Sequence, residues 1–222
     1  MQQLGKNSRV IELDLVSEYK KNIGYLIIKR VIDIIGALCG ILFLSPVMIV
    51  VGIWIKLDSK GVIFFIQNRV GKDGREFMMY KFRSMCTEAE FFLDRLQDKN
   101  EMSGPMFKIK EDPRVTKVGR FIRKTSIDEL PQLFNILKGE MSIVGPRPSL
   151  PKEVAQFTSF QKQRLIAKPG LTCYWQIRGR SDVSFEEWMK MDVKYLEERN
   201  TWIDIRLIFM TIRVLIGDEG AR

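Results

Sequence analysis

The sequence predicts an α+β protein in which a membrane helix precedes a compact, mainly helical domain with a small β-hairpin. Three observations predict this class. A long apolar run without charged residues lies at 34–55, two β-type runs flank a glycine turn within 61–85, and much of the remainder has helical periodicity with capping residues. The 222 residues suffice for one compact domain or two small ones.

The membrane segment is placed at residues 29–56, after a polar segment, 1–28, that is typical of a tail or a short surface helix. The uncharged run from Ile34 to Ile55 matches the roughly 20 residues that cross a bilayer core of about 30 Å. A cleaved signal peptide is excluded because the run starts late and no small-residue cleavage site follows it. A fully buried core helix is the alternative.

Pro46 lies near the middle of this run, and its presence leaves two possible paths for the segment through the membrane. The proline removes the backbone donor for the carbonyl of Leu42, which kinks or breaks a helix, and Ser45 can return a hydroxyl hydrogen bond to that carbonyl. Similar numbers of lysines and arginines flank both ends, so the positive-inside rule gives no orientation. The residues alone fit a Pro-kinked spanning helix and a re-entrant helix-break-helix whose two ends stay on one side.

Residues 57–222 are predicted to form one domain that begins with the hairpin. Apolar runs on either side of Gly71-Lys72-Asp73-Gly74 predict two strands joined by a turn. The last helix, 202–216, fits an amphipathic interfacial helix on acidic lipid or a core helix equally well. The other predicted elements are a helix at 87–99, a basic segment at 114–124, a helix at 128–138 ended by Gly139, a constrained loop at 145–151, helices at 152–167 and 184–198, and a strand at 171–177.

Charge and composition narrow the range of functions that this chain can have. Lys and Arg number 36 against 27 Asp and Glu, a formal charge of +9, which indicates an anionic partner: nucleic acid, phosphorylated metabolites or an acidic membrane surface. The absence of histidine excludes Ser-His-Asp and Cys-His nucleophile systems and His-ligated zinc. Three scattered cysteines form no disulfide framework and fit a reducing compartment.

Asp128 and Glu129 stand side by side in a basic neighbourhood and are the candidate catalytic pair. Arg120 and Arg123 precede them, and Arg147 follows between two prolines that would hold its guanidinium in place. Arginine suits bidentate phosphate recognition, neighbouring cations keep a carboxylate ionised, and paired carboxylates suit Mg²⁺.

The alternative to a catalytic role is that Glu129 belongs to a helix cap. Ser126 and Glu129 fit the S-x-x-E capping box, and Ser184 and Glu187 match the same pattern further on. Lys81 and Arg83 alternate along a predicted strand and share a face, which is either solvated or a lining of the cleft.

At these residues the chain resembles the bacterial sugar transferases, the monotopic phosphoglycosyl transferases that act on polyprenyl phosphate. The resemblance covers Lys29 to about Ile216. It rests on Ser45-Pro46 in the apolar run, on KFRSM, on TSIDELPQLFNILKGEMSIVGPRP and on KPGLTCYWQIRGR. It implies that Ser45-Pro46 breaks a re-entrant membrane helix and that the rest is a cytoplasmic catalytic domain, with the chain corresponding to the catalytic module of longer members.

The resemblance also implies the chemistry. Asp128 would attack a UDP-sugar to release UMP, and undecaprenyl phosphate would then accept the sugar-1-phosphate at the cytoplasmic face of the bacterial inner membrane. Glu129, with Asp128, would hold Mg²⁺ or assist proton traffic, and Arg147 would bind phosphate, with Lys81, Arg83, Arg120 and Arg123 as weaker assignments.

The identity of the partners is less constrained than the chemistry. Glucose or galactose is favoured by analogy, no nucleic acid is expected, and a homodimer is left open. The alternatives are a membrane-anchored Mg²⁺ phosphohydrolase and a non-catalytic anchored protein that binds nucleic acid.

Overall fold

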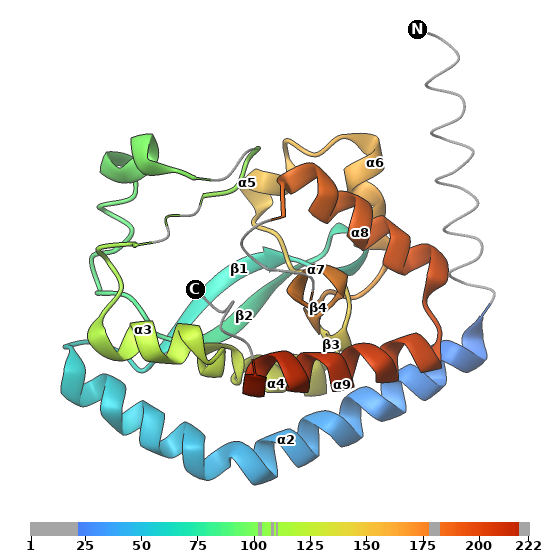
Figure 1. Ribbon diagram of the computed structural model, residues 1–222, viewed down its shortest axis with the longest axis horizontal. Coiled ribbons are helices and arrows are strands. Elements are labelled where there is room, and N and C mark those ends of the chain that lie inside the picture. Colours follow the sequence, from blue (N-terminus) through green and yellow to red (C-terminus); the bar gives the residue numbers. More distant parts are fainter. Residues whose placement is uncertain (1–21, 102–103, 108, 110, 178–182, 218–222) are drawn as a thin grey trace, which may run out of the picture.

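The computed structural model describes residues 22–101, 104–107, 109, 111–177 and 183–217. A long bent helix, α2 (Ile23–Asp58), runs along one side of the molecule, and the other elements lie on its concave side (Figure 1). The fold is α+β and mostly helical, as the sequence predicts, with two small two-stranded sheets.

Helix α2 is continuous over 36 residues, so the helix-break-helix expected at Ser45-Pro46 is corrected to one bent helix. The Ser45 hydroxyl donates to the carbonyl of Leu42 at 3.0 Å, as expected, and this bond replaces the donor that Pro46 lacks. The helix begins at Ile23 rather than at Lys29, because the Asn22 side chain accepts from the backbone N–H of Tyr25 and caps it. The part of the predicted polar tail before residue 22 lies outside the described residues.

The outer face of α2 is apolar and exposed. Ala37, Val51 and Ile55 are buried against the rest of the molecule, whereas many large apolar side chains of the helix face outward. By length and composition, α2 can cross a membrane. A fully buried core helix is therefore wrong, and the exposed apolar face of α2 suits a membrane location. The exposed large side chains are Ile23, Ile27, Ile28, Val31, Ile35, Leu38, Leu42, Phe43, Val47, Ile49, Val50, Ile53, Trp54 and Leu57.

The predicted hairpin is confirmed. Strands β1 (Phe64–Val70) and β2 (Glu76–Phe82) pair antiparallel, and a turn containing the 3₁₀ segment η1 (Lys72–Gly74) joins them. Asp73 and Gly74 have φ values of 56° and 76°, a conformation that Asp and Gly tolerate in turns. A second sheet pairs β3 (Ser142–Val144) with β4 (Gly170–Thr172) in parallel.

Several predicted helices are shorter than expected. The expected helix at 87–99 is a series of turns with a 3₁₀ helix, η2 (Asp94–Lys99). The expected helix at 152–167 divides into α5 (Pro151–Val154), α6 (Ser159–Lys162) and η4 (Gln163–Ile166), because the Thr158 side chain caps a new helix start. The expected strand at 171–177 ends at Thr172, and α7 (Tyr174–Ile177) follows.

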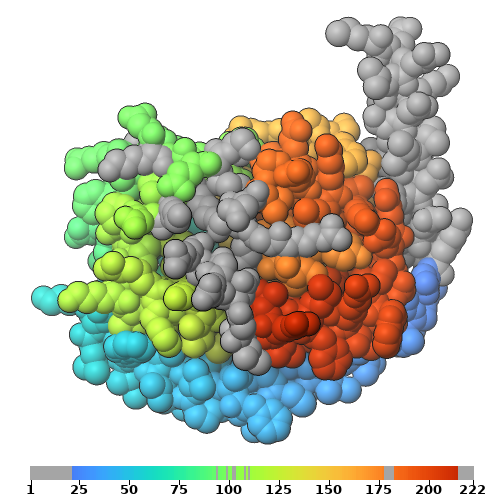
Figure 2. Space-filling view, in the orientation of Figure 1, coloured from blue at the N-terminus to red at the C-terminus, as the bar shows by residue number. Residues whose placement is uncertain are grey.

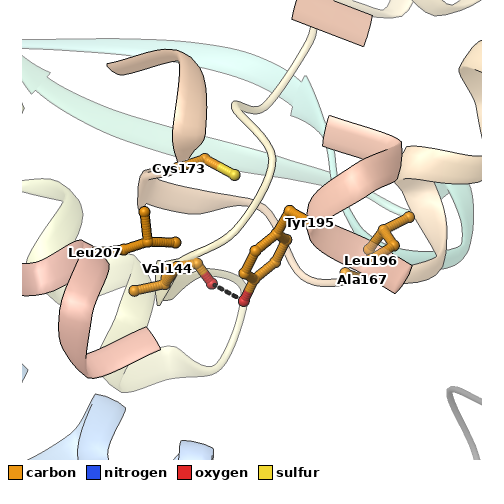
Figure 3. Packing of buried hydrophobic residues seen from close by; sticks show 6 residues of the cluster. All are labelled: Val144, Ala167, Cys173, Tyr195, Leu196 and Leu207. Atoms are coloured by element: carbon orange, nitrogen blue, oxygen red, sulfur yellow. Dashed lines mark hydrogen bonds between the residues drawn. The ribbon is translucent and has the colours of Figure 1, made fainter. Parts of the chain in front are cut away.

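The carboxyl-terminal helices match their predicted ranges. Helix α8 (Phe185–Glu198) begins at the predicted Ser184 cap, and α9 (Thr201–Gly217) follows it. One face of α9 enters the core through Leu207, which packs with Val144 and Tyr195 (Figure 3). Trp202 and Phe209 of α9 are exposed, so the helix has both a core face and an apolar outer face. Figure 2 shows α2 along one edge of the surface with α9 directly beside it.

Charged side chains tie the amino-terminal half of α2 to the globular domain. The Lys29 ammonium lies 2.8 Å from the carboxylate of Asp204 in α9. One oxygen of Asp33 accepts from the Ser142 hydroxyl at 2.9 Å and from the backbone N–H of Ile143 at 2.8 Å. These contacts hold the first half of α2 against α9 and β3.

The carboxyl-terminal end of α2 is tied to the same domain. The buried guanidinium of Arg83 donates to the carbonyls of Lys60 at 2.6 Å and Ser59 at 2.9 Å. The Asp58 carboxylate accepts from the backbone N–H of Val118, the second residue of α3 (Lys117–Lys124), at 3.3 Å. Both ends of α2 therefore meet one globular body. Ala37 and Ile41, near the middle of the helix, pack in a cluster with Leu133 and Ile136, so that the convex side of α2 is the side left exposed (Figure 1).

Candidate active site

The carboxylate pair lies in a short 3₁₀ turn, η3 (Ile127–Glu129), between α3 and α4 (Gln132–Lys138). The expected single helix at 128–138 therefore starts later, although it ends at Gly139 in the left-handed conformation as expected (φ 82°). Ile127 packs against an apolar cluster that includes Val51 and Ile55 of α2. This apolar contact ties the turn that carries the carboxylates to the membrane helix.

The capping-box alternative is wrong for this pair. Ser126 is in the left-handed region (φ 56°) and its side chain makes no capping hydrogen bond. At the second match the box does form, because the Ser184 and Glu187 side chains each accept from the other's backbone N–H at the start of α8. The same four-residue pattern thus forms a cap in one place, while Glu129 in the other pairs with cations.

Two cations from distant parts of the chain meet the pair. The Lys81 ammonium, on β2, lies 2.6 Å from Oε1 of Glu129 and 4.0 Å from Oδ2 of Asp128. The Arg147 guanidinium, in the loop after β3, lies 3.4 Å from the same Glu129 oxygen. The guanidinium also lies over the ring of Trp175, 5.5 Å from its centroid, a cation–π contact.

Asn135 braces this arrangement from α4. Its side chain is fully buried; the amide nitrogen donates to the carbonyl of Met78 at 2.7 Å and the amide oxygen accepts from the N–H of Tyr80 at 3.0 Å. These bonds attach α4 to the edge of β2 that does not pair with β1. The strand that carries Lys81 is thereby fixed relative to the helix that follows Asp128.

Burial is the largest influence on Asp128. The residue is only 8% exposed, and desolvation raises the pKa of its carboxyl to about 6. The positive charges of Lys81, Arg123 and Arg147 lower this pKa, while the charge of Glu129 raises it. Neighbouring cations were expected to dominate, but burial outweighs them. With this pKa the carboxyl stays largely ionised at neutral pH, so the group is available as a nucleophile.

The cleft beside the pair contains a further arginine that sequence reasoning missed. Arg69, on β1, lines the cleft with Lys81, Glu129 and Arg147. Burial, followed by the charge of Arg147, lowers the pKa of Arg69 to about 10, so it remains a cation at neutral pH. Its Nε is buried and has no hydrogen-bond partner among the described residues. A buried cluster of cations with an unpaired donor fits an anionic ligand.

A sequence signal for Arg69 exists. Gln67 and Arg69 are polar residues two positions apart in the predicted strand and so share one of its faces, and in the structure both are less exposed than Ile66 and Asn68 on the other face. Gln132 and Gln176 also line the cleft and were not singled out from the sequence. Amides in those places can donate to and accept from the polar groups of a substrate.

The other predicted phosphate ligands lie elsewhere. Arg83 follows the end of β2 and donates to the end of α2, so it does not share the cleft with Lys81. Arg123 is exposed on α3, and its charge acts on the pKa of Asp128. Arg120 is also exposed on α3, and its assignment to phosphate binding stays a prediction.

The donor set is consistent with Mg²⁺. Among the described residues, no group of three or more potential side-chain ligands is found. Mg²⁺ does not need such a group, because it usually keeps several waters and binds one or two carboxylates together with substrate phosphates. Asp128 and Glu129 supply two adjacent carboxylates of this kind.

The chain is similar to known proteins over most of its length. The family model for the bacterial sugar transferases matches residues 24–218. The chain is 49% identical over 199 residues to the galactosyl transferase CpsE of Streptococcus agalactiae, covering 89% of this chain and 44% of that protein.

Two further relatives were found. Identity to the undecaprenyl-phosphate galactose phosphotransferase of Salmonella typhimurium is 41%, over 87% of this chain and 41% of that protein. Identity to the exopolysaccharide production protein ExoY of Rhizobium meliloti is 36%, over 87% of both proteins. The chain thus spans less than half the length of the first two relatives and most of the third.

Proposed function

Because the chain belongs to the bacterial sugar transferase family, we propose that it transfers a sugar-1-phosphate from a UDP-sugar to undecaprenyl phosphate. The products are UMP and undecaprenyl-diphosphate-sugar, and the reaction is a first membrane step of exopolysaccharide, capsule or O-antigen synthesis. One observation carries the proposal: a buried carboxylate, Asp128, lies beside the Lys81, Glu129 and Arg147 cluster in a turn packed against the membrane helix.

The first step is a displacement at phosphorus. An oxygen of ionised Asp128 attacks the β-phosphorus of the UDP-sugar, the bond from that phosphorus to the bridging oxygen breaks, and UMP leaves with the electron pair. A covalent aspartyl-phosphosugar remains. Both the carboxylate and the diphosphate are anions and repel each other. The positive charges of Arg69, Lys81 and Arg147, which line the cleft, offset this repulsion.

Glu129 and Asp128 are the residues proposed to hold Mg²⁺ with the substrate phosphates. When bound, the ion neutralises phosphate charge and stabilises the departing UMP oxygens. Glu129 also holds Lys81, whose ammonium lies 2.6 Å away, so it orients this cation within the cleft.

In the second step, a phosphate oxygen of undecaprenyl phosphate attacks the same phosphorus and releases Asp128. This step requires the active site to lie at the headgroup plane of the membrane. A re-entrant α2 would place it there, because both ends of the helix are tied to the globular domain while its convex face is apolar and exposed. The protein would then be monotopic and face the cytoplasm, with the exposed apolar side chains of α9 and nearby cations lying on acidic lipid.

A hexose is the favoured sugar. Two of the three relatives reported above are named for galactose, and the segments TCYWQIRGR and SFEEW of this chain are similar to those of hexose-1-phosphate transferases.

Purified protein with Mg²⁺, undecaprenyl phosphate and a panel of UDP-sugars tests the reaction. We expect sustained UMP release only when the lipid is present, and at most one UMP per protein without it, since the covalent intermediate then accumulates. Asp128→Asn should abolish UMP release. Asp73→Asn, in the exposed hairpin turn, is the matched control and should retain it.

Other outcomes would contradict the proposal. Continuous formation of free sugar phosphate without lipid would indicate a phosphohydrolase. No turnover with any sugar, together with binding of nucleic acid, would favour a non-catalytic anchored protein.

Cysteine labelling tests the re-entrant path. In a variant without native cysteines, single cysteines at Asn22 and at Lys60 mark the two ends of α2, and both positions are exposed. A membrane-impermeant thiol reagent should label both in inside-out vesicles and neither in intact spheroplasts. Labelling of the two positions from opposite sides would show that α2 spans the membrane.

A further inference from the structure

The loop that carries Arg147 is held by contacts from outside itself. Pro146 and Pro148 have no N–H groups, so the loop has few donors with which to form its own turns. Three successive carbonyls are instead bound by other segments. The Arg147 carbonyl accepts from Arg164 at 2.7 Å, that of Pro148 from Arg69 at 3.0 Å, and that of Ser149 from the N–H of Val70 at 2.9 Å.

Arg164 makes the most extensive of these contacts. It lies in η4, is 2% exposed, and donates through Nη1 to the Ser149 hydroxyl at 2.7 Å and through Nη2 to the Arg147 carbonyl. The same Nη2 lies 2.6 Å from a carboxylate oxygen of Asp192 in α8, which is fully buried. Asp192 therefore neutralises the guanidinium and holds it in the position from which it reaches the loop.

Two tryptophans connect the two arginines. The Arg164 guanidinium is 5.1 Å from the ring centroid of Trp188, and the Arg147 guanidinium is 5.5 Å from that of Trp175. The two indole rings touch, with centroids 4.9 Å apart. Arg164 is thus connected to Arg147 in two ways: directly, by its hydrogen bond to the backbone carbonyl of Arg147, and indirectly, through the two indole rings in contact.

A purely structural role explains this arrangement poorly. A buried ion pair contributes little net stability relative to well-packed apolar side chains of the same size. An apolar replacement could fill the space, but it could not bind the carbonyl and hydroxyl of a loop with so few donors of its own. The planar fork of an arginine is suited to holding both acceptors at a fixed spacing.

We propose that Arg164, held by Asp192, is a positioning residue that fixes the 145–149 loop so that the Arg147 guanidinium stays beside Glu129. Arg164 touches neither substrate nor the reacting atoms and acts through Arg147. This inference rests on the proposed function for its catalytic consequence, but the contacts that carry it do not depend on which sugar is transferred.

The test is a double-mutant cycle on UMP release. Arg164→Lys keeps the charge but loses the fork, and we expect turnover to fall by about 10- to 100-fold, since misplacing a catalytic group by about 1 Å can cost about 100-fold. In an Arg147→Ala background, the same change should cost less than about threefold, because the group it positions is already absent. Lys162→Ala, an exposed cation two positions away, is the matched control and should behave as the parent in both backgrounds.

Two results would overturn the inference. One is unchanged turnover in Arg164→Lys. The other is a loss of equal size in the parent and in the Arg147→Ala background, which indicates a general structural effect. If Arg164→Lys does not fold, Ser149→Ala removes one acceptor and leaves the ion pair intact, and the same cycle is applied to it.

Hydrogen exchange separates this inference from the proposed function. Arg164→Lys should accelerate exchange in peptides that cover 145–150 and leave the hairpin turn at 71–75 unchanged, whether or not the protein turns over any UDP-sugar. Unchanged exchange in the loop would refute the positioning role. A parent protein that shows no UMP release, but whose loop responds as expected, would refute only the proposed function.

Discussion

Replacing Asp128 by asparagine should abolish activity and stabilise the fold. In the folded protein, burial raises the pKa of this carboxyl from 3.8 to about 6. At neutral pH the unfolded chain therefore holds an ionised carboxyl in water, while the folded protein holds the same charge where it is poorly solvated. Asparagine has nearly the same shape and carries no charge, so the variant avoids this cost.

The magnitude follows from the pKa shift. One pKa unit corresponds to about 1.4 kcal/mol, so the shift corresponds to about 3 kcal/mol of unfolding free energy at pH 7. For a chain of this size, 1 kcal/mol changes the melting temperature by about 2–4 °C. We therefore expect the melting temperature of Asp128→Asn to exceed that of the parent by about 6–12 °C.

The pH dependence has a defined sign. Because the folded pKa is raised, the cost appears as pH rises above 3.8, when the unfolded chain releases its proton, and it reaches its full value above about 6. The advantage of Asp128→Asn should be nearly absent at pH 4 and fully present at pH 7.5.

Thermal unfolding in detergent or nanodiscs, followed by tryptophan fluorescence, measures this difference. Asp73→Asn changes an exposed carboxylate in the same way and should leave the melting temperature within about 1 °C of the parent at both pH values. A variant at Asp128 that melts at or below the parent at pH 7.5 would refute the reasoning, as would an advantage that persists at pH 4.

Three other predictions concern the residues around the site. Lys81→Met removes the largest charge that lowers the pKa of Asp128, so the acid limb of kcat/KM should move to higher pH; an unmoved limb would mean that another group titrates. Asp204→Ala leaves the ammonium of Lys29 without its buried partner and should lower stability by about 3–5 kcal/mol, measured by thermal unfolding, where a loss below about 1 kcal/mol would contradict a tie to α2. Gly119→Ala would place a methyl group 1.9 Å from the Ser84 carbonyl oxygen and should reduce the yield of folded protein sharply, as seen by size-exclusion chromatography. Gly24→Ala, with open space around it, should not, and equal yields would contradict the close packing of α3.

Features that depend on neighbouring residues were predictable from the sequence. The hydrogen bond from Ser45 to the carbonyl of Leu42, the turn at 71–74 and the cap at Ser184 each involve atoms within four positions of one another. Their geometry follows from local backbone chemistry, so a short pattern is sufficient to predict them. The long uncharged run likewise predicted an exposed apolar helix.

Features that depend on distant residues were harder to predict. Ser126 and Ser184 begin the same S-x-x-E pattern, yet only Ser184 forms a cap. The backbone of Ser126 is in the left-handed region, and Ile127 beside it packs in a cluster that includes Val51 and Ile55 of α2. Lys81 and Arg83 alternate in sequence, yet the strand ends between them. Lys81 pairs with the carboxylate of Glu129, whereas Arg83 donates to the carbonyl of Ser59 at the end of α2.

The sequence by itself determined the class of this protein: an apolar membrane helix, an adjacent carboxylate pair and a basic domain without histidine. Only the tertiary structure decided that Lys81 and Arg147 lie beside Glu129, and that burial has a larger effect than neighbouring charges on the pKa of Asp128. It also decided that Arg164 donates to the loop that carries Arg147. The reason is physical. Composition and local pattern set which groups are present, but the desolvation and distance that control their chemistry arise when segments far apart in the chain pack together.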